Sequence, residues 1–369
     1  MKYYLISGEA SGDLHGSNLI NAIHAQDAQA YIRCWGGDKM EAAGATLVKH
    51  YRELAFMGFV EVLKNISTIL KNLTFCKEDI LNYKPDVLVL IDYPGFNLRI
   101  AKWAKENNIR VIYYISPQVW AWKENRVKMM KQCIDKMLVI LPFEKDYYKN
   151  KWNWEVDYVG HPLVVEVERF KIKGERLKEY QKPVIALLPG SRKQEILKKL
   201  PVMLEVSKHF PDYEFVVAKA PGLDDSFYLS LIKNYHNVSS VSNQTYALLK
   251  QSTAALVTSG TATLETALFG IPEVVCYKGN EISYQIAKRL VNIKYISLVN
   301  LIMDKEVVKE LIQHEMNTEQ LTAELKKILP GGVQREQVLN DYQQLKALLS
   351  ADGDASAKAA KLIHDFVSK

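Results

Sequence analysis

Apolar and polar residues alternate along the chain in blocks that predict strands followed by helices. In the first half, short apolar runs predict strands at 2–7, 31–35, 86–91, 110–115 and 137–141. Amphipathic segments between them predict helices at 14–26, 60–82, 97–107, 122–134 and 143–150. The run Val87–Ile91 has no polar face, which is typical of parallel strands covered on both sides. This alternation predicts a parallel sheet with right-handed crossovers.

The second half repeats the alternation. Strands are predicted near 183–188, 214–219, 238–241, 254–257 and 273–277, and the chain is predicted to be helical from about 303 onwards, with breaks at 330–332 and 352–354. A polar stretch at 166–182 predicts an interdomain linker. We therefore expect an α/β protein of two Rossmann-like domains facing each other across a cleft, over residues 1–168 and 169–345, with a helical tail at 346–369.

Composition agrees with two globular domains in a reducing compartment. Hydrophobic residues make up 48% of the chain and charged residues 24%, so both halves can form a core. The four cysteines, Cys34, Cys76, Cys133 and Cys276, are far apart in the sequence and predict buried thiols rather than disulfides or a zinc site. The first residues predict a strand rather than a secretory signal, and no apolar run approaches the ~20 residues of a spanning helix. We expect a cytoplasmic protein.

The net charge of +6 is carried by scattered lysines. A modest basic excess favours an anionic membrane surface or anionic ligands. No nucleic-acid-binding module is recognisable, so a nucleic-acid partner is not expected. The chain has neither a P-loop nor a G-x-G-x-x-G fingerprint. Its only D-x-D, Asp352-Gly-Asp354, is predicted to be a turn, so neither a metal nor another cofactor is expected.

In the first half, acidic residues follow two predicted strands. Glu9 lies in the segment Ser7–Asp13 after the first strand, and Asp92 follows Val87–Ile91 directly. Both are expected at the carboxyl edge of the sheet, where open α/β proteins bind ligands. A carboxylate there could accept a proton from an attacking hydroxyl, but an aspartate before Pro-Gly is also a common turn residue.

In the second half, two small-residue turns suit a phosphate. Gly190-Ser191-Arg192 places a guanidinium after a strand, where it could bind a diphosphate or be solvated at a helix start. Thr261 begins a helix after Ser259-Gly260, and Glu265 lies about one turn further on. The helix start could bind phosphate and Glu265 ribose hydroxyls, or the segment could be an ordinary capped helix.

Other features of the sequence allow two interpretations. Residues 55–73 carry more apolar surface than one sheet-facing stripe needs, which predicts either an acyl-chain or membrane patch or a buried helix. The patch consists of Phe56, Met57, Phe59, Val60, Val62 and Leu63. Trp120 and Trp122 predict a sugar-stacking wall or a packed turn. For His15 a structural role is favoured, and His161 is either a core residue or a donor in the cleft.

Taken together, the motifs resemble the lipid-A-disaccharide synthase family. The resemblance runs in order through nearly the whole chain: Ser7–Asp13, Met57–Val62, Asp92–Asn97, Ser116–Trp122, Leu141–Glu144, Val159–Pro162, Leu188–Arg192, Ser259–Glu265, Ile296–Leu301 and Glu310–Gln313. It implies a GT-B glycosyltransferase that joins UDP-linked 2,3-diacylglucosamine to 2,3-diacylglucosamine 1-phosphate. The products would be a β-1,6-linked disaccharide 1-phosphate, formed with inversion, and UDP.

The resemblance also implies roles for residues. Asp92 would be the general base and Glu9 a second catalytic residue, while Ser191, Arg192, Thr261, Glu265 and Asn300 would hold UDP. It implies a homodimer bound peripherally to the inner membrane of a Gram-negative bacterium. Members of the family often carry a second acidic residue where this chain has Gly95, which makes Asp92 the sole base there.

Two alternative functions remain compatible with the sequence. One is another UDP-sugar enzyme of the same fold, such as a non-hydrolysing epimerase or a peptidoglycan glycosyltransferase. The other is a non-catalytic peripheral membrane module that binds nucleotide-sugar. The first would not need the apolar 55–73 surface, and the second would not need Asp92, Glu9 and Arg192 together.

Overall fold

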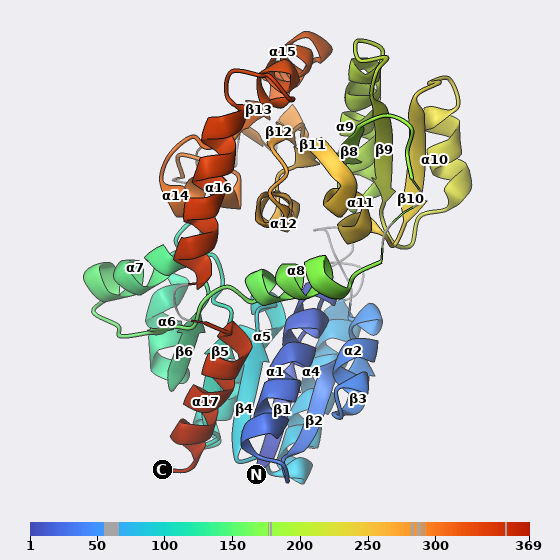
Figure 1. Cartoon of the computed structure of the whole chain (residues 1–369). Helices are drawn as coiled ribbons and strands as arrows, with labels where there is room; N and C mark the ends of the chain where they lie inside the picture. Colours follow the sequence, from blue (N-terminus) through green and yellow to red (C-terminus); the bar gives the residue numbers. More distant parts are fainter. Residues whose placement is uncertain are drawn as a thin grey trace. The chain divides into compact units, whose positions relative to one another are not determined.

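The chain divides into two compact units. The computed structural model describes residues 1–54, 66–175, 177, 179–281, 284–285, 289, 291, 293–350 and 353–369. The first unit comprises Met1–Pro162 and Ser350–Lys369, and the second comprises Leu163–Leu349 (Figure 1). The chain changes unit after Pro162 and again after Leu349, so its last segment belongs to the first unit.

The described part of the first unit contains a seven-stranded parallel sheet in the order β3-β2-β1-β4-β5-β6-β7. Its strands are β1 (Lys2–Ile6), β2 (Tyr31–Gly36), β3 (Thr46–His50), β4 (Val87–Ile91), β5 (Val111–Tyr114), β6 (Lys136–Val139) and β7 (Asp157–Tyr158). The five strands predicted here are confirmed. The two edge strands, β3 and β7, were missed because β3 is only partly buried and β7 has two residues, so neither forms an apolar run.

Helices cover both faces of this sheet (Figure 1). They are α1 (Ala10–Gln26), α2 (Asp38–Ala42), a 3₁₀ turn (Tyr51–Glu53), α4 (Ile66–Tyr83), α5 (Pro94–Glu106), α6 (Arg126–Cys133), α7 (Pro142–Trp152) and α17 (Ala355–Val367). The C-terminal helix α17 packs along α1, with Ala359, Ala360 and Ile363 buried. Small residues on this face allow the two helices to approach closely.

The second unit has a parallel sheet of six described strands in the order β10-β9-β8-β11-β12-β13. Its strands are β8 (Val184–Leu188), β9 (Glu214–Lys219), β10 (Val238–Ser242), β11 (Ser252–Thr258), β12 (Glu273–Tyr277) and β13 (Lys309–Ile312). The prediction of continuous helix after 303 was wrong at β13. This four-residue strand begins with Lys-Glu and lies at the sheet edge, so its sequence carries little strand signal.

The remaining helices belong to the second unit. They are α8 (Pro162–Lys173), α9 (Lys193–Ser207), α10 (Asp225–Ile232), α11 (Thr245–Gln251), α12 (Thr261–Phe269), α14 (Leu298–Met303), a 3₁₀ turn (Gln313–Glu315), α15 (Thr318–Ile328) and α16 (Arg335–Ser350). The linker expected from 166 onwards begins as helix α8. Its polar residues bind the second unit, since Lys171 donates to the Leu268 carbonyl at 2.7 Å and Glu168 pairs with Lys346 at 2.9 Å.

One core residue makes the stability of the second unit depend on pH. Glu273 begins β12 and is 1% exposed. Neither of its carboxylate oxygens makes a hydrogen bond of good geometry with another described residue. Burial raises the pKa of Glu273 well above its usual range, and the neighbouring Tyr342 hydroxyl opposes this to a smaller extent. The folded protein therefore keeps a proton on Glu273 that the unfolded chain loses above about pH 4.3.

Replacing Glu273 with glutamine is expected to stabilise the protein at neutral and alkaline pH. Above the unfolded pKa the folded state binds the extra proton, so the parent loses stability as pH rises, by about 1.4 kcal/mol per pH unit at most. Glutamine has no proton to lose. Thermal unfolding midpoints of the two proteins should be similar near pH 4 and diverge towards pH 8. A difference that stays constant over this range would contradict a neutral Glu273.

Candidate active site

The carboxyl ends of β1 and β4 form the first part of the site. These strands are neighbours, and Ile6 pairs in register with Leu90. The chain leaves β1 towards β2 on one side and leaves β4 towards β5 on the other. Ligands bind at such a switch point in open α/β sheets. Glu9 and Asp92 follow these two strands, so the fold brings both predicted catalytic residues to one edge.

Asp92 lies in a turn that neighbouring side chains hold in place. Asp92 and Tyr93 have φ angles of 45° and 48°, a left-handed conformation that costs a non-glycine residue about 1–3 kcal/mol. The Asp92 carbonyl accepts hydrogen bonds from the Tyr113 hydroxyl at 2.6 Å and from Asn97 Nδ2 at 2.8 Å. These bonds use the main chain, so they fix the turn without occupying the carboxylate.

The segment after β1 is shaped by close packing. A Cβ on Gly8 would lie 2.3 Å from Cδ1 of Tyr93, so only glycine fits beside the Asp92 turn. Asp13 is buried and accepts hydrogen bonds from the N–H groups of Gly37 at 2.8 Å and Met40 at 3.0 Å. Asp13 therefore holds the start of α2, and Glu9 is the carboxylate of this segment that lies beside Asp92.

Burial and like charge shift the pKa values of two carboxyl groups in the first unit. Burial, then the Glu9 charge, raises the pKa of Asp92 to about 7. Burial also raises the pKa of Glu144, in the first turn of α7, to about 8. The Glu144 carboxylate accepts hydrogen bonds from the Leu141 N–H at 3.0 Å and from Trp120 Nε1 at 3.3 Å. A carboxylate with a pKa near neutrality is well suited to general-base catalysis.

A second switch point lies in the second unit, between β8 and β11. These neighbouring strands pair with Leu187 opposite Leu256. Beyond their carboxyl ends lies a pocket of about 490 Å³, a size typical of small-molecule sites. Four of the residues predicted to hold UDP line it: Ser191, Arg192, Thr261 and Glu265. The fold thus brings together two turns that are about 70 residues apart in the sequence.

One side of this pocket carries two cations around a carboxylate. Arg192 precedes α9 and pairs with Glu195 at 3.1 Å. Lys199, one turn later, is 4% exposed; its Nζ lies 3.6 Å from Glu195 Oε2 and donates to Thr258 Oγ1 at the end of β11. Burial lowers the pKa of Lys199, and the Glu195 charge opposes this. Gly190 has a φ of 116°, which turns the chain over these groups.

The other side of the pocket is the start of α12. Gly260 precedes the helix with a φ of 146°, and a Cβ there would meet no described atom within 4 Å. The free N–H groups of a helix start and its dipole favour an anion. Glu265, one turn further on, accepts a hydrogen bond from the Tyr246 hydroxyl at 2.8 Å. Burial raises the pKa of Glu265, while the Tyr246 bond opposes this.

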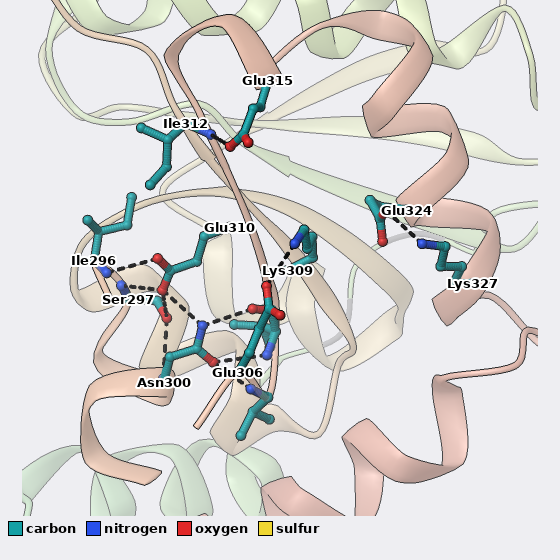
Figure 2. Close-up of polar contacts among 12 residues, drawn as sticks. Ile296, Ser297, Asn300, Glu306, Lys309, Glu310, Ile312, Glu315, Glu324 and Lys327 are labelled. Carbon is teal, nitrogen blue, oxygen red and sulfur yellow. Dashed lines mark hydrogen bonds and ion pairs between the residues drawn. The ribbon is translucent and has the colours of Figure 1, made fainter. Parts of the chain in front are cut away.

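Asn300 is not among the described residues that line the pocket. It is fully buried, and Figure 2 shows its side chain among backbone groups and Glu310. Its Oδ1 accepts from the N–H groups of Val307 and Val308, and its Nδ2 donates to the Val308 carbonyl and to Glu310 Oε1, at 2.8–3.0 Å. These four bonds use the full hydrogen-bonding capacity of the amide.

This network reaches the pocket through Glu310. The Glu310 carboxylate accepts hydrogen bonds from the N–H groups of Ile296 and Ser297, both at 2.9 Å (Figure 2). The carbonyl of Ile296 in turn accepts from Ser259 Oγ at 2.8 Å, and Ser259 lines the pocket. Asn300 is therefore connected to the start of α12 through Glu310, Ile296 and Ser259.

The apolar patch of six residues, Phe56, Met57, Phe59, Val60, Val62 and Leu63, lies outside the described residues. The described helix α4, which follows it, exposes Leu70, Phe75 and Leu81 to solvent. Among the described helices, none is long and apolar enough to cross a membrane. The described residues also contain no group of three or more His, Cys, Asp or Glu side chains placed to hold a metal ion.

The two histidines of interest are buried in the first unit. Burial lowers the pKa of His15 to about 4 and that of His161 to about 3, so both are neutral at pH 7. The tryptophans differ from each other. Trp120 packs edge-on against Phe143, whereas Trp122 is 50% exposed and has Lys123 Nζ 4.2 Å from its ring centroid. Trp122 is therefore the more exposed of the two rings.

Two ionisable residues of these sites were not predicted from the sequence. Glu144 lies three residues after Leu141, at a position where a carboxylate caps the start of a helix. This spacing does not indicate that Glu144 is buried near Asp92. Lys199 follows Glu195 by four residues, which places both on one face of α9. Lysine is so often exposed that this spacing alone predicts a surface ion pair.

Comparison with known proteins agrees with this geometry. The family model described as lipid-A-disaccharide synthetase matches residues 3–363. The lipid-A-disaccharide synthase of Syntrophus aciditrophicus is 36% identical over 99% of this chain and 97% of its own length. That of Psychromonas ingrahamii is 37% identical over 96% of each chain.

Solved structures share the fold at low sequence identity. The glycotransferase of kitacinnamycin has a TM-score of 0.72 at 15% identity, with 99% of each chain covered. The UDP-GlcNAc 2-epimerase from Neisseria meningitidis, solved with UDP-GlcNAc, has a TM-score of 0.69 at 13% identity over 100% of each chain. Two Rossmann-like units with C-terminal helices are the GT-B fold. By its full-length match to the family model and to these relatives, the chain belongs to the lipid-A-disaccharide synthase family.

Proposed function

We propose that this protein is the glycosyltransferase that makes the lipid A disaccharide. It transfers 2,3-diacylglucosamine from UDP to the 6-hydroxyl of 2,3-diacylglucosamine 1-phosphate, with inversion, and releases UDP. The observation that carries this proposal is the family relationship over almost the whole chain. The two switch-point sites agree with it, because one offers a base and the other a pocket for an anion.

In this proposal the two units have separate roles. The first unit binds the acyl chains and the acceptor, and the second unit binds the UDP-sugar. Asp92 takes the proton of the acceptor hydroxyl, whose oxygen attacks C1 of the donor sugar while the bond from C1 to the diphosphate breaks. Glu9 assists by raising the proton affinity of Asp92.

The second unit holds the leaving nucleotide. Arg192, Ser191 and the helix start at Thr261 bind the diphosphate, and Glu265 binds the ribose hydroxyls. Charge on the leaving group is stabilised best by donors already in place before the reaction. Asn300 contributes to UDP binding indirectly, because its amide holds Glu310, which orders the segment that Ser259 contacts.

We also propose where the protein works. The apolar residues of 55–73 receive acyl chains or contact the inner membrane from the cytoplasmic side, helped by the basic excess of the chain. We propose that the protein assembles as a homodimer. Cosedimentation with anionic vesicles and the mass in solution test these two points separately.

The rival functions predict different products. An epimerase would interconvert UDP-sugars without an acylated acceptor, and a binding module would release no UDP. The epimerases match at 12–14% identity, which shows only the fold, whereas the synthases match at about 36%. Incubating the purified protein with both acylated sugars and analysing the mixture by mass spectrometry tests the proposal: the disaccharide 1-phosphate is expected, and an epimerised UDP-sugar or unchanged substrates would contradict it.

The pH profile should report the environment of Asp92. Only the deprotonated carboxylate accepts a proton, so kcat/KM is expected to rise with pH and level off above a pKa of about 7. Glu9→Gln removes a charge that raises this pKa, so the rising limb should move to lower pH. The exposed Glu41→Gln is the matched control and should leave the limb in place. A limb that does not move in Glu9→Gln would contradict the coupling.

A further inference from the structure

The pocket of the second unit contains a negative charge of its own. Glu195 lines it, with Oε1 3.1 Å from Arg192 Nη1 and Oε2 3.6 Å from Lys199 Nζ. A nucleoside diphosphate that enters the pocket, as the proposed function requires, meets a guanidinium that already binds a carboxylate. The diphosphate and Glu195 therefore compete for the Arg192 guanidinium.

The two cations are held very differently. Arg192 is 62% exposed, and exposed ion pairs are weak, so its contact with Glu195 is easily exchanged. Lys199 is 4% exposed and is also bound to Thr258 Oγ1. A buried cation depends on its carboxylate more strongly than an exposed one does, because removal of the carboxylate leaves a buried charge without solvation. The ion pair of Glu195 with Lys199 is therefore expected to be harder to break than its exposed ion pair with Arg192.

The turn at Gly190 packs closely against Glu195 and Lys199. A Cβ on Gly190 would lie 2.9 Å from Glu195 Oε2 and 3.5 Å from Lys199 Nζ. Gly190 and Thr258 both line the pocket, so the lysine sits directly behind the surface that an anion would touch. Glu195 thus contacts both cations from one position at the pocket wall.

We propose that Glu195 acts as an internal substitute for the diphosphate and that Lys199 is the positioning residue that withdraws it. In the absence of nucleotide, Glu195 neutralises Arg192. When the diphosphate binds Arg192, Glu195 is retained by Lys199. This inference rests on the proposed function, since it concerns the same nucleotide pocket. It predicts that UDP affinity is set partly by competition within the protein.

A double-mutant cycle on UDP binding tests this. Glu195→Gln removes the competitor, and calorimetric titration of the full chain should show UDP binding about two- to fivefold tighter, the range expected for an exposed ion pair. Lys199→Met frees Glu195 for Arg192, so binding should weaken by a similar factor. In the Glu195→Gln background, Lys199→Met should have almost no effect.

The cycle separates this role from simpler ones. If Lys199 attracted the diphosphate directly, Lys199→Met would weaken binding equally in both backgrounds. Uridine, which has no phosphate, should bind all four proteins equally, and thermal unfolding shows whether each variant is folded. Equal or weaker UDP binding by folded Glu195→Gln overturns the inference alone, and this holds even if Lys199→Met fails to fold. Failure of the unsubstituted chain to bind UDP overturns the proposed function as well.

Discussion

Asp92→Asn is expected to lower turnover by about 10²–10⁴-fold, the usual contribution of a general base, while UDP binding is preserved. Asparagine cannot accept the proton of the acceptor hydroxyl. It tolerates the left-handed backbone of this position, where φ is 45°. The bonds from Tyr113 and Asn97 go to the main-chain carbonyl and are retained. The substitution therefore removes the base and leaves the turn intact.

Three measurements make this result specific. Disaccharide formation gives the loss of turnover, calorimetric titration gives the affinity for UDP, and thermal unfolding shows that the variant is folded. Asp365→Asn, which changes an exposed carboxylate on α17, is the matched control and should retain full activity. Turnover within tenfold of the parent for a folded Asp92→Asn would remove Asp92 from this role.

Arg192→Met is expected to have the second largest effect. A hydrogen bond to a charged group contributes about 1.5–3 kcal/mol, so UDP should bind about 10–150-fold more weakly. Turnover should fall by about 10²–10³-fold, because the guanidinium also stabilises charge that develops on the leaving diphosphate. Methionine replaces the aliphatic part of the arginine side chain without its charge, and Glu195 keeps its ion pair with Lys199.

The neighbouring Lys193 provides a matched control. Lys193→Met removes the same charge one residue away, from a side chain whose Nζ lies 5.3 Å from the ring centroid of Phe227. If Arg192 acts by direct contact, only Arg192→Met should lose UDP affinity, and uridine binding should change in neither variant. Equal losses in both variants would show that general charge, rather than Arg192 itself, attracts the nucleotide.

The sequence by itself determined the alternating α/β architecture and the sheet edges at which the candidate site residues lie. Parallel strands buried on both faces need continuous apolar runs, so β4 and β8 were visible as Val87–Ile91 and Val184–Leu188. The residues after these strands had to lie at the carboxyl edge, because the strands of a parallel sheet all end there. Asp92 and Arg192 were identified for that reason.

Elements whose signal depends on neighbours were not visible. The edge strands β3, β7 and β13 are short or only partly buried, so their residues show no apolar run. Helix α8 looked like a linker because it is rich in charge, but Lys171 and Glu168 bind partners about 100 and 180 residues away along the chain. Such pairing is decided only when the chain is folded.

Only the tertiary structure decided how each polar side chain is used. Asn300 looked like a ligand residue, yet its amide is fully bonded inside the fold. Glu144 and Lys199 were not selected as site residues from the sequence, yet both are buried beside the two sites. The local sequence sets which strand or helix a residue occupies, but the solvation of its side chain, and hence its pKa and its chemistry, depends on segments that meet it only in the folded protein.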